Sequence, residues 1–318
     1  MKIITHAGRA HLDDFVSCAI AIVNATWRRM EFGERSDHPI TLRAAIAETV
    51  QDTVIYRRNP TAEEIEDKDV LVLDVGGQYD PSKGNFDHHQ LPKGSKDSAM
   101  TLFAANIGLP DGSFDGSVYE PGNPFPTDSL AEFMEMAFPW FRTRAEVDSC
   151  GPFATAKAKG VEWETVSSFL GPFEDMILGQ FEEERIPMNR IMLIDQLATM
   201  IAEKFDAYRR VASTMKRESP WWAEDLVILD FTACYPKDAE AVSDIITDRE
   251  KGGVAIFHDN RGEGLTILRL HDDPRIDFTK VKDDPEVAFC HNGGFIVKTK
   301  SKDLDKAWRL IESAYINK

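Results

Sequence analysis

Short apolar runs rich in β-branched residues recur along the first half of the chain and predict strands. Ile3 to Thr5 and Val70 to Leu73 are such runs, and Thr41 to Ile46 and Thr53 to Tyr56 are further candidates. From Leu12 to Val23, by contrast, apolar residues follow the spacing of a helix. Strands that alternate with helices are typical of a parallel sheet, so we predict a doubly wound α/β fold for this half.

The second half of the chain begins with helical patterns and ends with strands. Ser129 to Arg144 has the spacing of one amphipathic helix, and Val161 to Phe205 is mostly helical. Leu226 to Leu229 predicts a strand. Val254 to Phe257 and Leu265 to Leu268 predict a hairpin, because a glycine-rich turn separates them.

The length of 318 residues exceeds one ordinary hydrophobic core, so we predict more than one domain. The Ser219-Pro220 pair interrupts the helical pattern and marks a boundary. The predicted division is a first α/β domain over residues 1–150, a helical connecting region over residues 151–221, and a smaller α/β domain over residues 222–318.

The formal net charge of −17 limits the class of partner. Sequence-independent binding of nucleic acid depends on Lys and Arg side chains that neutralise phosphates, so this composition excludes a general nucleic-acid binder. A phosphate substrate is compatible with it, because metal ions and a local basic patch can reverse the potential at a pocket. The charge therefore favours a short or small substrate over a long duplex.

Hydrophobicity and cysteine content indicate the compartment. No stretch approaches the ~18 apolar residues that a membrane span needs, and MKIITHAG lacks the features of a secretion signal. The four cysteines lie far apart without Cys-x-x-Cys spacing, which is typical of free thiols in a reducing compartment. We therefore expect a cytoplasmic protein with no membrane partner. The sequence leaves the oligomeric state open, a homo-oligomer included.

Histidines and aspartates gather directly after two of the predicted strands. Open α/β sheets bind ligands at the carboxyl ends of their strands, so both groups can point at one crevice. Imidazole and carboxylate suit first-row divalent metals, and a bridging carboxylate suits a pair of them. The first group consists of His6, His11 and Asp13, and the second consists of Asp74, Asp87, His88 and His89.

These motifs resemble the DHH phosphoesterase superfamily and, within it, the Myg-type (melanocyte-proliferating-gene) metal-dependent hydrolases. That family shows Thr-His-x-Gly-x-x-His-x-Asp, then Asp-Val-Gly-Gly-x-Tyr-Asp-Pro, then Asp-His-His-Gln. The C-terminal segment from Phe289 to Ile296 resembles the family's His-x-x-Gly-Phe-Ile signature. His11 stands where most DHH enzymes have a carboxylate, as in the Myg-type variant. The matching N-terminal residues are Thr5 to Gly8, His11, Asp13, Asp74 to Gly77, Tyr79 to Pro81 and Asp87 to Gln90.

The resemblance implies two Mn²⁺ or Mg²⁺ ions in a two-domain phosphoesterase. His6 and His11 would hold one ion, Asp13 and His88 would hold the other, and Asp74 would bridge them. Asp87 would accept an imidazole N–H and orient that ligand, and His89 would donate a hydrogen bond to the substrate phosphate. The bridged pair would lower the pKa of a shared water that attacks phosphorus.

Two further parts of the site follow from the resemblance. The superfamily has a fourth motif with an aspartate, for which Asp148 is the candidate and Asp128 the alternative. A glycine-rich element of the second domain binds the substrate in DHH enzymes, and glycines allow bare backbone N–H groups to approach a phosphate. The candidates for that element are His291, Asn292, Gly293 and Gly294.

The Myg-type resemblance implies a 3′–5′ exonuclease that acts on short or single-stranded RNA. The superfamily also contains phosphatases and phosphodiesterases of small nucleotides, so a nucleotide or another phosphorylated metabolite is the alternative substrate. A protein of another class, a catalytically silent DHH-fold binding protein, is the third hypothesis. Metal-dependent hydrolysis separates the first two from the third.

Overall fold

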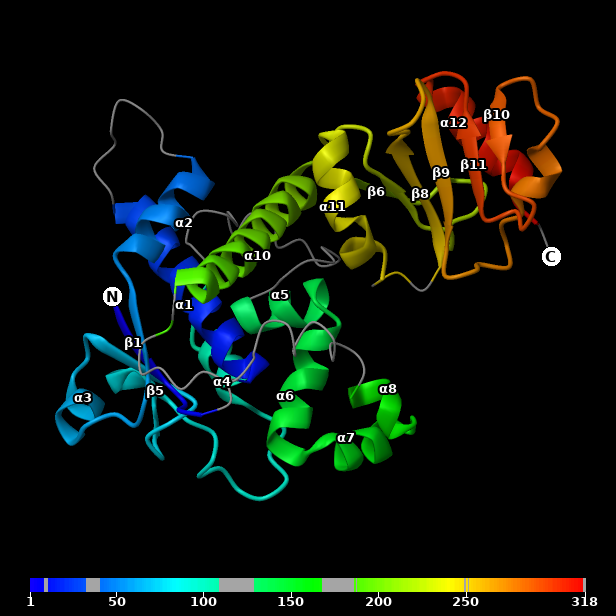
Figure 1. Ribbon diagram of the computed structural model, residues 1–318. Coiled ribbons are helices and arrows are strands. Elements are labelled where there is room, and N and C mark those ends of the chain that lie inside the picture. The colour runs from blue at the N-terminus through cyan, green and yellow to red at the C-terminus, as the bar shows by residue number, and fades with distance from the viewer. Residues whose placement is uncertain are drawn as a thin grey trace. The chain divides into compact units, whose positions relative to one another are not determined.

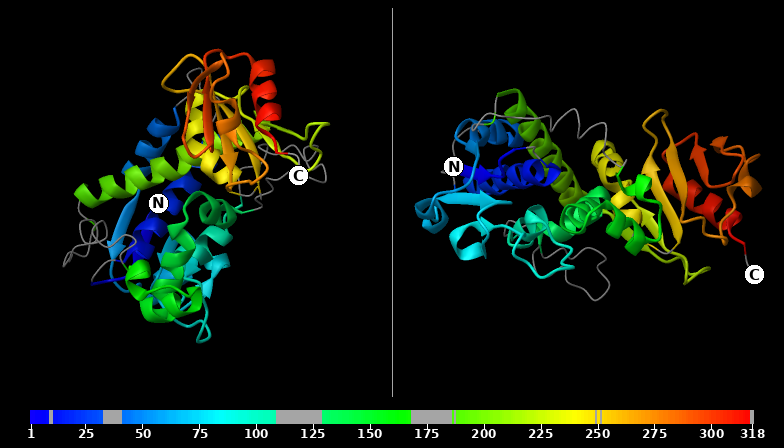
Figure 2. Two further views of the ribbon diagram at one scale, coloured as in Figure 1. Left: turned by 90° about the vertical axis from the view of Figure 1, so that its right-hand side faces the viewer. Right: turned by 60° about the horizontal axis from the view of Figure 1, so that its bottom comes forward.

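The computed structural model describes residues 1–8, 11–32, 41–108, 129–167, 186, 188–248, 250 and 252–316. The chain forms two compact units, Met1–Glu203 and Lys204–Lys318, and the boundary between them falls within the helix α10 (Met188–Thr214). Each unit contains its own sheet with helices (Figures 1 and 2). The predicted α/β class, with a parallel N-terminal sheet and a second α/β part, is confirmed. The predicted domain limits at residues 150 and 221 stay a prediction.

The first unit is built on a five-stranded sheet with the order β2-β1-β3-β5-β4. Its central strand β1 (Lys2–Thr5) pairs in parallel with β2 (Val54–Arg57) and with β3 (Val70–Leu73). The short β5 (Asn85–Phe86) is parallel to β3, and β4 (Tyr79–Asp80) runs antiparallel to β5. The carboxyl ends of four parallel strands therefore lie at one edge of the sheet.

The helix α1 (Leu12–Phe32) follows β1 and lies at the centre of the first unit. It packs against α2 (Leu42–Gln51), α4 (Ala99–Ala105) and α6 (Trp140–Cys150), and it also contacts β3 (Figure 1). Its apolar residues from Phe15 to Val23 are buried, which fixes the orientation of its first turn. The other helical segments of the unit are α3 (Ala62–Glu66), η1 (Pro81–Lys83), α5 (Leu130–Ala137), α7 (Pro152–Lys159) and α8 (Trp163–Ser167).

The strand predicted from Thr41 to Ile46 was wrong, because this segment begins α2. Thr41 caps the helix, and its side chain accepts a hydrogen bond from the N–H of Ala44 at 3.3 Å. Ala45, Ile46 and Thr49 are the buried positions, and their spacing is that of a helix face. The strand prediction relied on the β-branched residues of Thr41 to Ile46. That segment is too short to show the helical spacing of buried residues, which becomes visible only when Thr49 is included.

The single helix predicted from Ser129 to Arg144 was also wrong. Phe138 and Pro139 separate α5 from α6, because proline cannot donate the backbone hydrogen bond that a continuous helix requires. The break lets α6 run in a new direction and contact both α1 and α4.

The second unit contains a six-stranded sheet with the order β10-β11-β9-β8-β7-β6. The predicted hairpin is confirmed as β8 and β9, which pair antiparallel, and β7 runs parallel to β8. One face of this sheet packs against α12 (Leu304–Ala314) and η3 (Phe278–Val281), and α11 (Pro236–Thr247) contacts β8. The strands are β6 (Lys216–Glu218), β7 (Ile228–Asp230), β8 (Gly253–His258), β9 (Leu265–Leu270), β10 (Val287–Cys290) and β11 (Ile296–Thr299).

Across the residues that the structure describes, no helix combines the length and the hydrophobicity needed to cross a membrane.

Candidate metal centre

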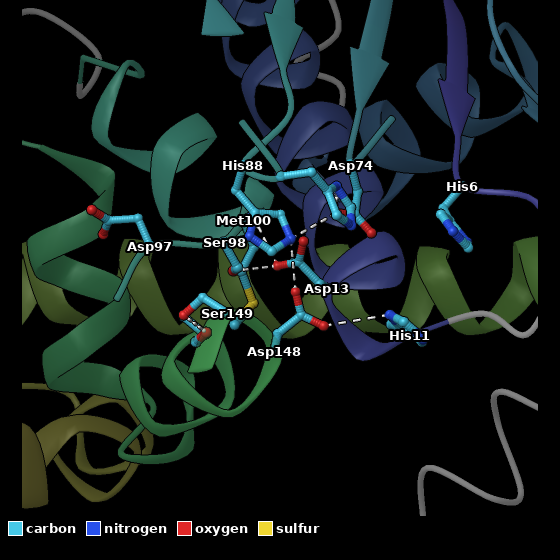
Figure 3. Close-up of polar contacts among 12 residues, drawn as sticks. His6, His11, Asp13, Asp74, His88, Asp97, Ser98, Met100, Asp148 and Ser149 are labelled. Carbon is cyan, nitrogen blue, oxygen red and sulfur yellow. Dashed lines mark hydrogen bonds and ion pairs between the residues drawn. The ribbon is translucent and has the colours of Figure 1, made fainter. Parts of the chain in front are cut away.

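Four acidic and imidazole side chains of the first unit meet at one point, although they come from distant parts of the sequence (Figure 3). One ligand atom of each lies within 4.8 Å of the corresponding atom of every other member. Three of the four residues are buried, and the fourth is half-buried. This cluster, called the acidic cluster below, consists of Asp13, Asp74, His88 and Asp148.

Asp74 enters the acidic cluster at the end of β3 with an unusual backbone. Its φ is +57°, in the left-handed region, and its N–H donates to the carbonyl of Phe86 at 3.1 Å. This conformation costs a non-glycine residue roughly 1–2 kcal/mol, although aspartate tolerates it better than most. Asp74 Oδ1 is buried and forms an ion pair with His88 Nε2 at 3.1 Å, but it accepts no hydrogen bond of good geometry from the described residues. A strained residue whose buried carboxylate oxygen lacks a hydrogen bond suggests a function.

Asp13 lies in the first turn of α1 and has one anchored and one unpaired oxygen. Its Oδ1 accepts hydrogen bonds from Ser98 Oγ at 2.5 Å and from the N–H of Met100 at 3.0 Å (Figure 3). Its Oδ2 is buried and has no hydrogen-bond partner in the described part of the chain. Metal-binding carboxylates are held in this way, with one oxygen oriented by hydrogen bonds and the other directed to the ion.

Asp148, near the end of α6, lies between two imidazoles. Its Oδ2 is 3.0 Å from His88 Nε2, and its Oδ1 is 3.4 Å from His11 Nδ1 (Figure 3). The structure therefore brings the predicted fourth-motif aspartate into the acidic cluster. The alternative, Asp128, lies outside the described residues.

The other predicted imidazoles form a second group beside the acidic cluster. The ring centroids of His6 and His11 are 5.7 Å apart, those of His6 and His89 are 6.5 Å apart, and those of His88 and His89 are 4.5 Å apart. His6 Nδ1 is buried and has no hydrogen-bond partner among the residues that the structure describes. His6 and His11 lie next to the cluster but outside its 4.8 Å limit. The first ion that the sequence assigned to these two residues stays a prediction.

Asp87 is buried and holds the turn that carries the two neighbouring histidines. Its carboxylate accepts hydrogen bonds from the N–H groups of Gly77 at 2.6 Å and His89 at 2.9 Å, and His89 Nδ1 lies 2.6 Å from it. Burial raises the pKa of Asp87, but these N–H groups outweigh burial and hold the pKa below its ordinary value. We expected Asp87 to orient a metal-binding imidazole. The structure pairs it with His89 and not with His88, because His89 is within reach of the same short turn.

Asp14 is a part of the site that the sequence analysis did not identify. Its buried carboxylate accepts hydrogen bonds from Thr5 Oγ1, from the N–H of His6 at 3.3 Å and from the N–H of His11 at 2.9 Å. It therefore joins the end of β1 to the start of α1. One feature of the sequence could have indicated Asp14, because it is the second acidic residue in the first turn of the predicted helix. A carboxylate at that position can accept hydrogen bonds from backbone N–H groups that have no partner within the helix.

The first prediction tests this positioning role. Asp14→Ala releases the backbone that carries His6 and His11, and we expect the affinity for Mn²⁺ to fall by about 10–100-fold, as for other outer partners of metal ligands. Calorimetric titration with Mn²⁺ measures the effect. Asp14→Asn, which keeps one acceptor, should retain part of the affinity. Wild-type Mn²⁺ affinity in a folded Asp14→Ala protein would show that Asp14 has no such role.

The electrostatics of the acidic cluster favour a cation. Burial raises the pKa of Asp13 well above its usual range, and the nearby Asp74 and Asp148 raise it further. Burial lowers the pKa of His88, but Asp148 and Asp74 outweigh burial and raise it to about 10. The hydrogen bond to Asp148 raises the pKa of His11 to about 9.

Without another cation, protons offset the crowded negative charge of this cluster. A divalent ion would supply that positive charge and would displace the protons. The oxygens of Asp13 and Asp74 that lack a hydrogen bond within the described chain, together with the mixed carboxylate–imidazole set, thus fit a first-row divalent metal or magnesium.

The predicted substrate-binding turn lies in the second unit, between β10 and β11. The N–H of Gly293 donates to His291 Nδ1 at 3.0 Å, and the N–H of Gly294 donates to the carbonyl of His291 at 2.8 Å. The expectation of bare N–H groups was therefore wrong. Position 294 favours glycine for a structural reason. Its φ is +63°, and a Cβ there would lie 2.4 Å from Asp277 Oδ1. The groups left for a substrate are His291 Nε2 and the Asn292 carboxamide, and this role stays a prediction.

Comparison with known proteins supports the resemblance for the N-terminal third of the chain. The family model MYG1_exonuc, described as an uncharacterised protein family (UPF0160), matches residues 2–105. The match includes Asp13, Asp74 and His88 but neither Asp148 nor the second unit. No curated protein matches the chain. A solved structure titled "Member of s1p family of ribosomal proteins PF0399 DHH domain" is 14% identical, covers 98% of this chain and 85% of that chain, and has a TM-score of 0.28, too low to support an argument.

Proposed function

We propose that this chain is a metal-dependent phosphoesterase that removes nucleotides from the 3′ end of short or single-stranded RNA. The observation that carries the proposal is the buried acidic cluster, in which Asp13 and Asp74 each have an oxygen that accepts no hydrogen bond from the described residues. The name of the family model that matches residues 2–105 supports the choice of a nuclease.

The residues of the site divide into ligands and the groups that hold them. Asp13, His88 and Asp148 would hold one Mn²⁺ or Mg²⁺ ion, His6 and His11 would hold a second, and Asp74 would contact both. Such ions, when bound, act as Lewis acids towards a phosphoryl oxygen and lower the pKa of water. Ser98 Oγ and the N–H of Met100 keep Asp13 oriented, and Asp14 holds the backbone of His6 and His11.

His89 is the imidazole that we assign to the substrate, although one of its ring nitrogens also lies within 4.8 Å of ligand atoms of Asp74 and His88. Its side chain is 57% exposed, and Asp87 holds its Nδ1 at 2.6 Å. Nε2 is therefore the nitrogen that can face a phosphate, and it donates a hydrogen bond when the ring is protonated on both nitrogens. Asp87 thus positions His89, and His89 contacts the substrate.

Hydrolysis by water is favoured over a covalent intermediate. Ser98 Oγ already donates to Asp13, Ser149 Oγ donates to the carbonyl of Ala145 at 2.9 Å, and Cys150 Sγ donates to the carbonyl of Ser95 at 3.2 Å. Ser98 is fully buried and its hydroxyl is held by Asp13, and within the described chain Ser149 and Cys150 donate to backbone carbonyls and not to a side-chain base that would activate a nucleophile.

A panel of substrates tests the proposed function. The full-length protein is incubated with Mn²⁺, or with EDTA, and with a short RNA labelled at its 5′ end, a matching DNA, a cyclic dinucleotide, pyrophosphate and a nucleoside bisphosphate. We expect stepwise shortening of the RNA from its 3′ end and release of 5′-monophosphates, both abolished by EDTA. If only a small substrate is hydrolysed, the substrate class is that small molecule and not RNA. No turnover of any substrate would assign the chain to the silent binding proteins.

The second prediction concerns the turn between β10 and β11. If His291 contacts the substrate phosphate, His291→Ala should raise KM for RNA about tenfold or more, the effect of losing one charge-assisted hydrogen bond, with a smaller change in kcat. Calorimetry with Mn²⁺ on the same variant is the control, because a substrate contact leaves metal affinity unchanged. Lost metal affinity with an unchanged KM would place His291 among the metal ligands.

A further inference from the structure

One face of the sheet in the second unit packs on a buried core, and the opposite face is only partly covered. Ile256, Ile267 and Val297 belong to the buried core that packs with α12. The strand register places Phe257 opposite Thr266, and Thr266 opposite Lys298. Because side chains alternate along a strand, these three lie on the other face. There α11 contacts β8 but leaves β9, β11 and β10 without a helix of their own among the described elements.

The partly covered face forms a groove of about 460 Å³ beside α11. This volume lies within the range of roughly 300–1,000 Å³ that is typical of small-molecule sites. Its lining includes three aromatic rings, those of Phe257, Phe289 and Phe295. Phe289 is 48% exposed, so its ring is available to a ligand. Rings in such an arrangement favour a flat aromatic ligand that stacks on them.

Charged residues at the groove favour an anionic group on the same ligand. Arg261, in the turn between β8 and β9, also lines the groove, and within the described chain its guanidinium has no hydrogen-bond or ion-pair partner. Lys298 lines the groove too and forms an ion pair with Asp259 at 2.5 Å. The one acidic lining residue, Glu240, is engaged by Asn260 Nδ2 at 2.9 Å. The Arg261 guanidinium, which has no partner within the described chain, can therefore pair with a phosphate of the ligand.

His258 is another lining residue of the groove. Its Nε2 donates to the carbonyl of Thr232 at 2.9 Å, which fixes the ring. Its Nδ1 is buried and has no partner in the described structure, so this nitrogen is not exposed to a ligand.

We propose that this groove binds one nucleoside monophosphate unit, with its base against Phe289 and Phe295 and its phosphate on Arg261. The choice of a nucleotide rests on the proposed function, because the flat ring and the phosphate are then parts of the RNA substrate. The groove itself is formed within the second unit and needs no metal. Binding can therefore be measured while catalysis is switched off.

The test is calorimetric titration of the full-length protein with AMP in the presence of EDTA. Ribose 5-phosphate, which lacks the base, is the matched ligand. We expect AMP to bind with a one-to-one stoichiometry and ribose 5-phosphate to bind at least about tenfold more weakly, given the usual contribution of base stacking. Phe289→Ala and Arg261→Ala should each weaken AMP binding about tenfold. Trp221→Ala is the control, because Trp221 is 85% exposed in the same unit and does not line the groove.

Three results would overturn the proposal. They are no binding of AMP, equal binding of AMP and ribose 5-phosphate, and AMP affinity unchanged by Phe289→Ala. If Phe289→Ala alters the sedimentation coefficient but not AMP affinity, the groove is a contact between protein chains and the proposal fails. The two proposals fail separately. RNA hydrolysis without AMP binding in EDTA would contradict only the proposal that the groove binds a nucleotide. AMP binding without any hydrolysis would contradict only the proposed activity.

Discussion

Asp74→Asn is expected to lower kcat/KM for RNA by more than about 100-fold and to leave the fold intact. Changing an outer partner of a metal ligand typically costs 10–100-fold, and Asp74 lies within the acidic cluster itself. An amide oxygen is neutral and is a poor bridge between two cations. Steady-state kinetics with saturating Mn²⁺ measure the loss.

The choice of asparagine makes this a test of chemistry and not of folding. Asparagine tolerates the left-handed backbone that Asp74 adopts, whereas most other residues would add strain. Removing one charge from a crowded group of carboxylates should leave the Tm of the metal-free protein unchanged or higher. Asp80→Asn is the matched control, because Asp80 lies in the same segment outside the cluster. Near wild-type hydrolysis by Asp74→Asn would contradict the proposed role.

Asp148→Asn is expected to lower the affinity for Mn²⁺ by more than about 100-fold, again because a direct ligand should matter more than its outer partners. The Asp148 carboxylate lies 3.4 Å from His11 Nδ1 and 3.0 Å from His88 Nε2, so it contacts both imidazoles. Its removal should also lower the pKa values of these two histidines, since its charge and hydrogen bonds raise them. Calorimetric titration with Mn²⁺ measures the affinity, and NMR titration of the imidazoles measures the pKa values.

A second carboxylate on the same helix provides the control for Asp148. Glu146 pairs with Lys159 at 3.0 Å and with Lys96 at 3.4 Å, and it does not belong to the acidic cluster. Glu146→Gln should therefore bind Mn²⁺ like the wild type, whatever its effect on the Tm. If Asp148→Asn keeps wild-type affinity, the fourth-motif aspartate is another residue, and Asp128 is then the first to test.

Most of the acidic cluster could be predicted because its members are tied to strand ends. Asp74 directly follows β3, and His88 follows β5, so the parallel sheet places both at one edge. Asp13 is in the first turn of the helix after β1, which brings it to the same edge. For these three residues, the position relative to a predicted strand or helix was enough to predict that their side chains lie at one edge of the sheet.

Asp148 could be proposed only from the family pattern, because its position depends on packing. It reaches His88 since Pro139 breaks the helix and α6 then packs against α1 and α4. Asp14 was missed for a related reason. Its three hydrogen bonds join residues on β1, the following loop and α1, and no local pattern shows that these will be adjacent.

Local periodicity and short spacings were enough to predict the α/β class, the parallel N-terminal sheet and the residues of the strand-end motifs. The packed structure was needed to show which imidazole Asp87 holds, that the N–H groups of Gly293 and Gly294 already have acceptors, and that one sheet face of the second unit carries an aromatic groove. Each of these depends on the directions of side chains and N–H groups after packing. Such directions follow from contacts between elements, which residue order does not specify.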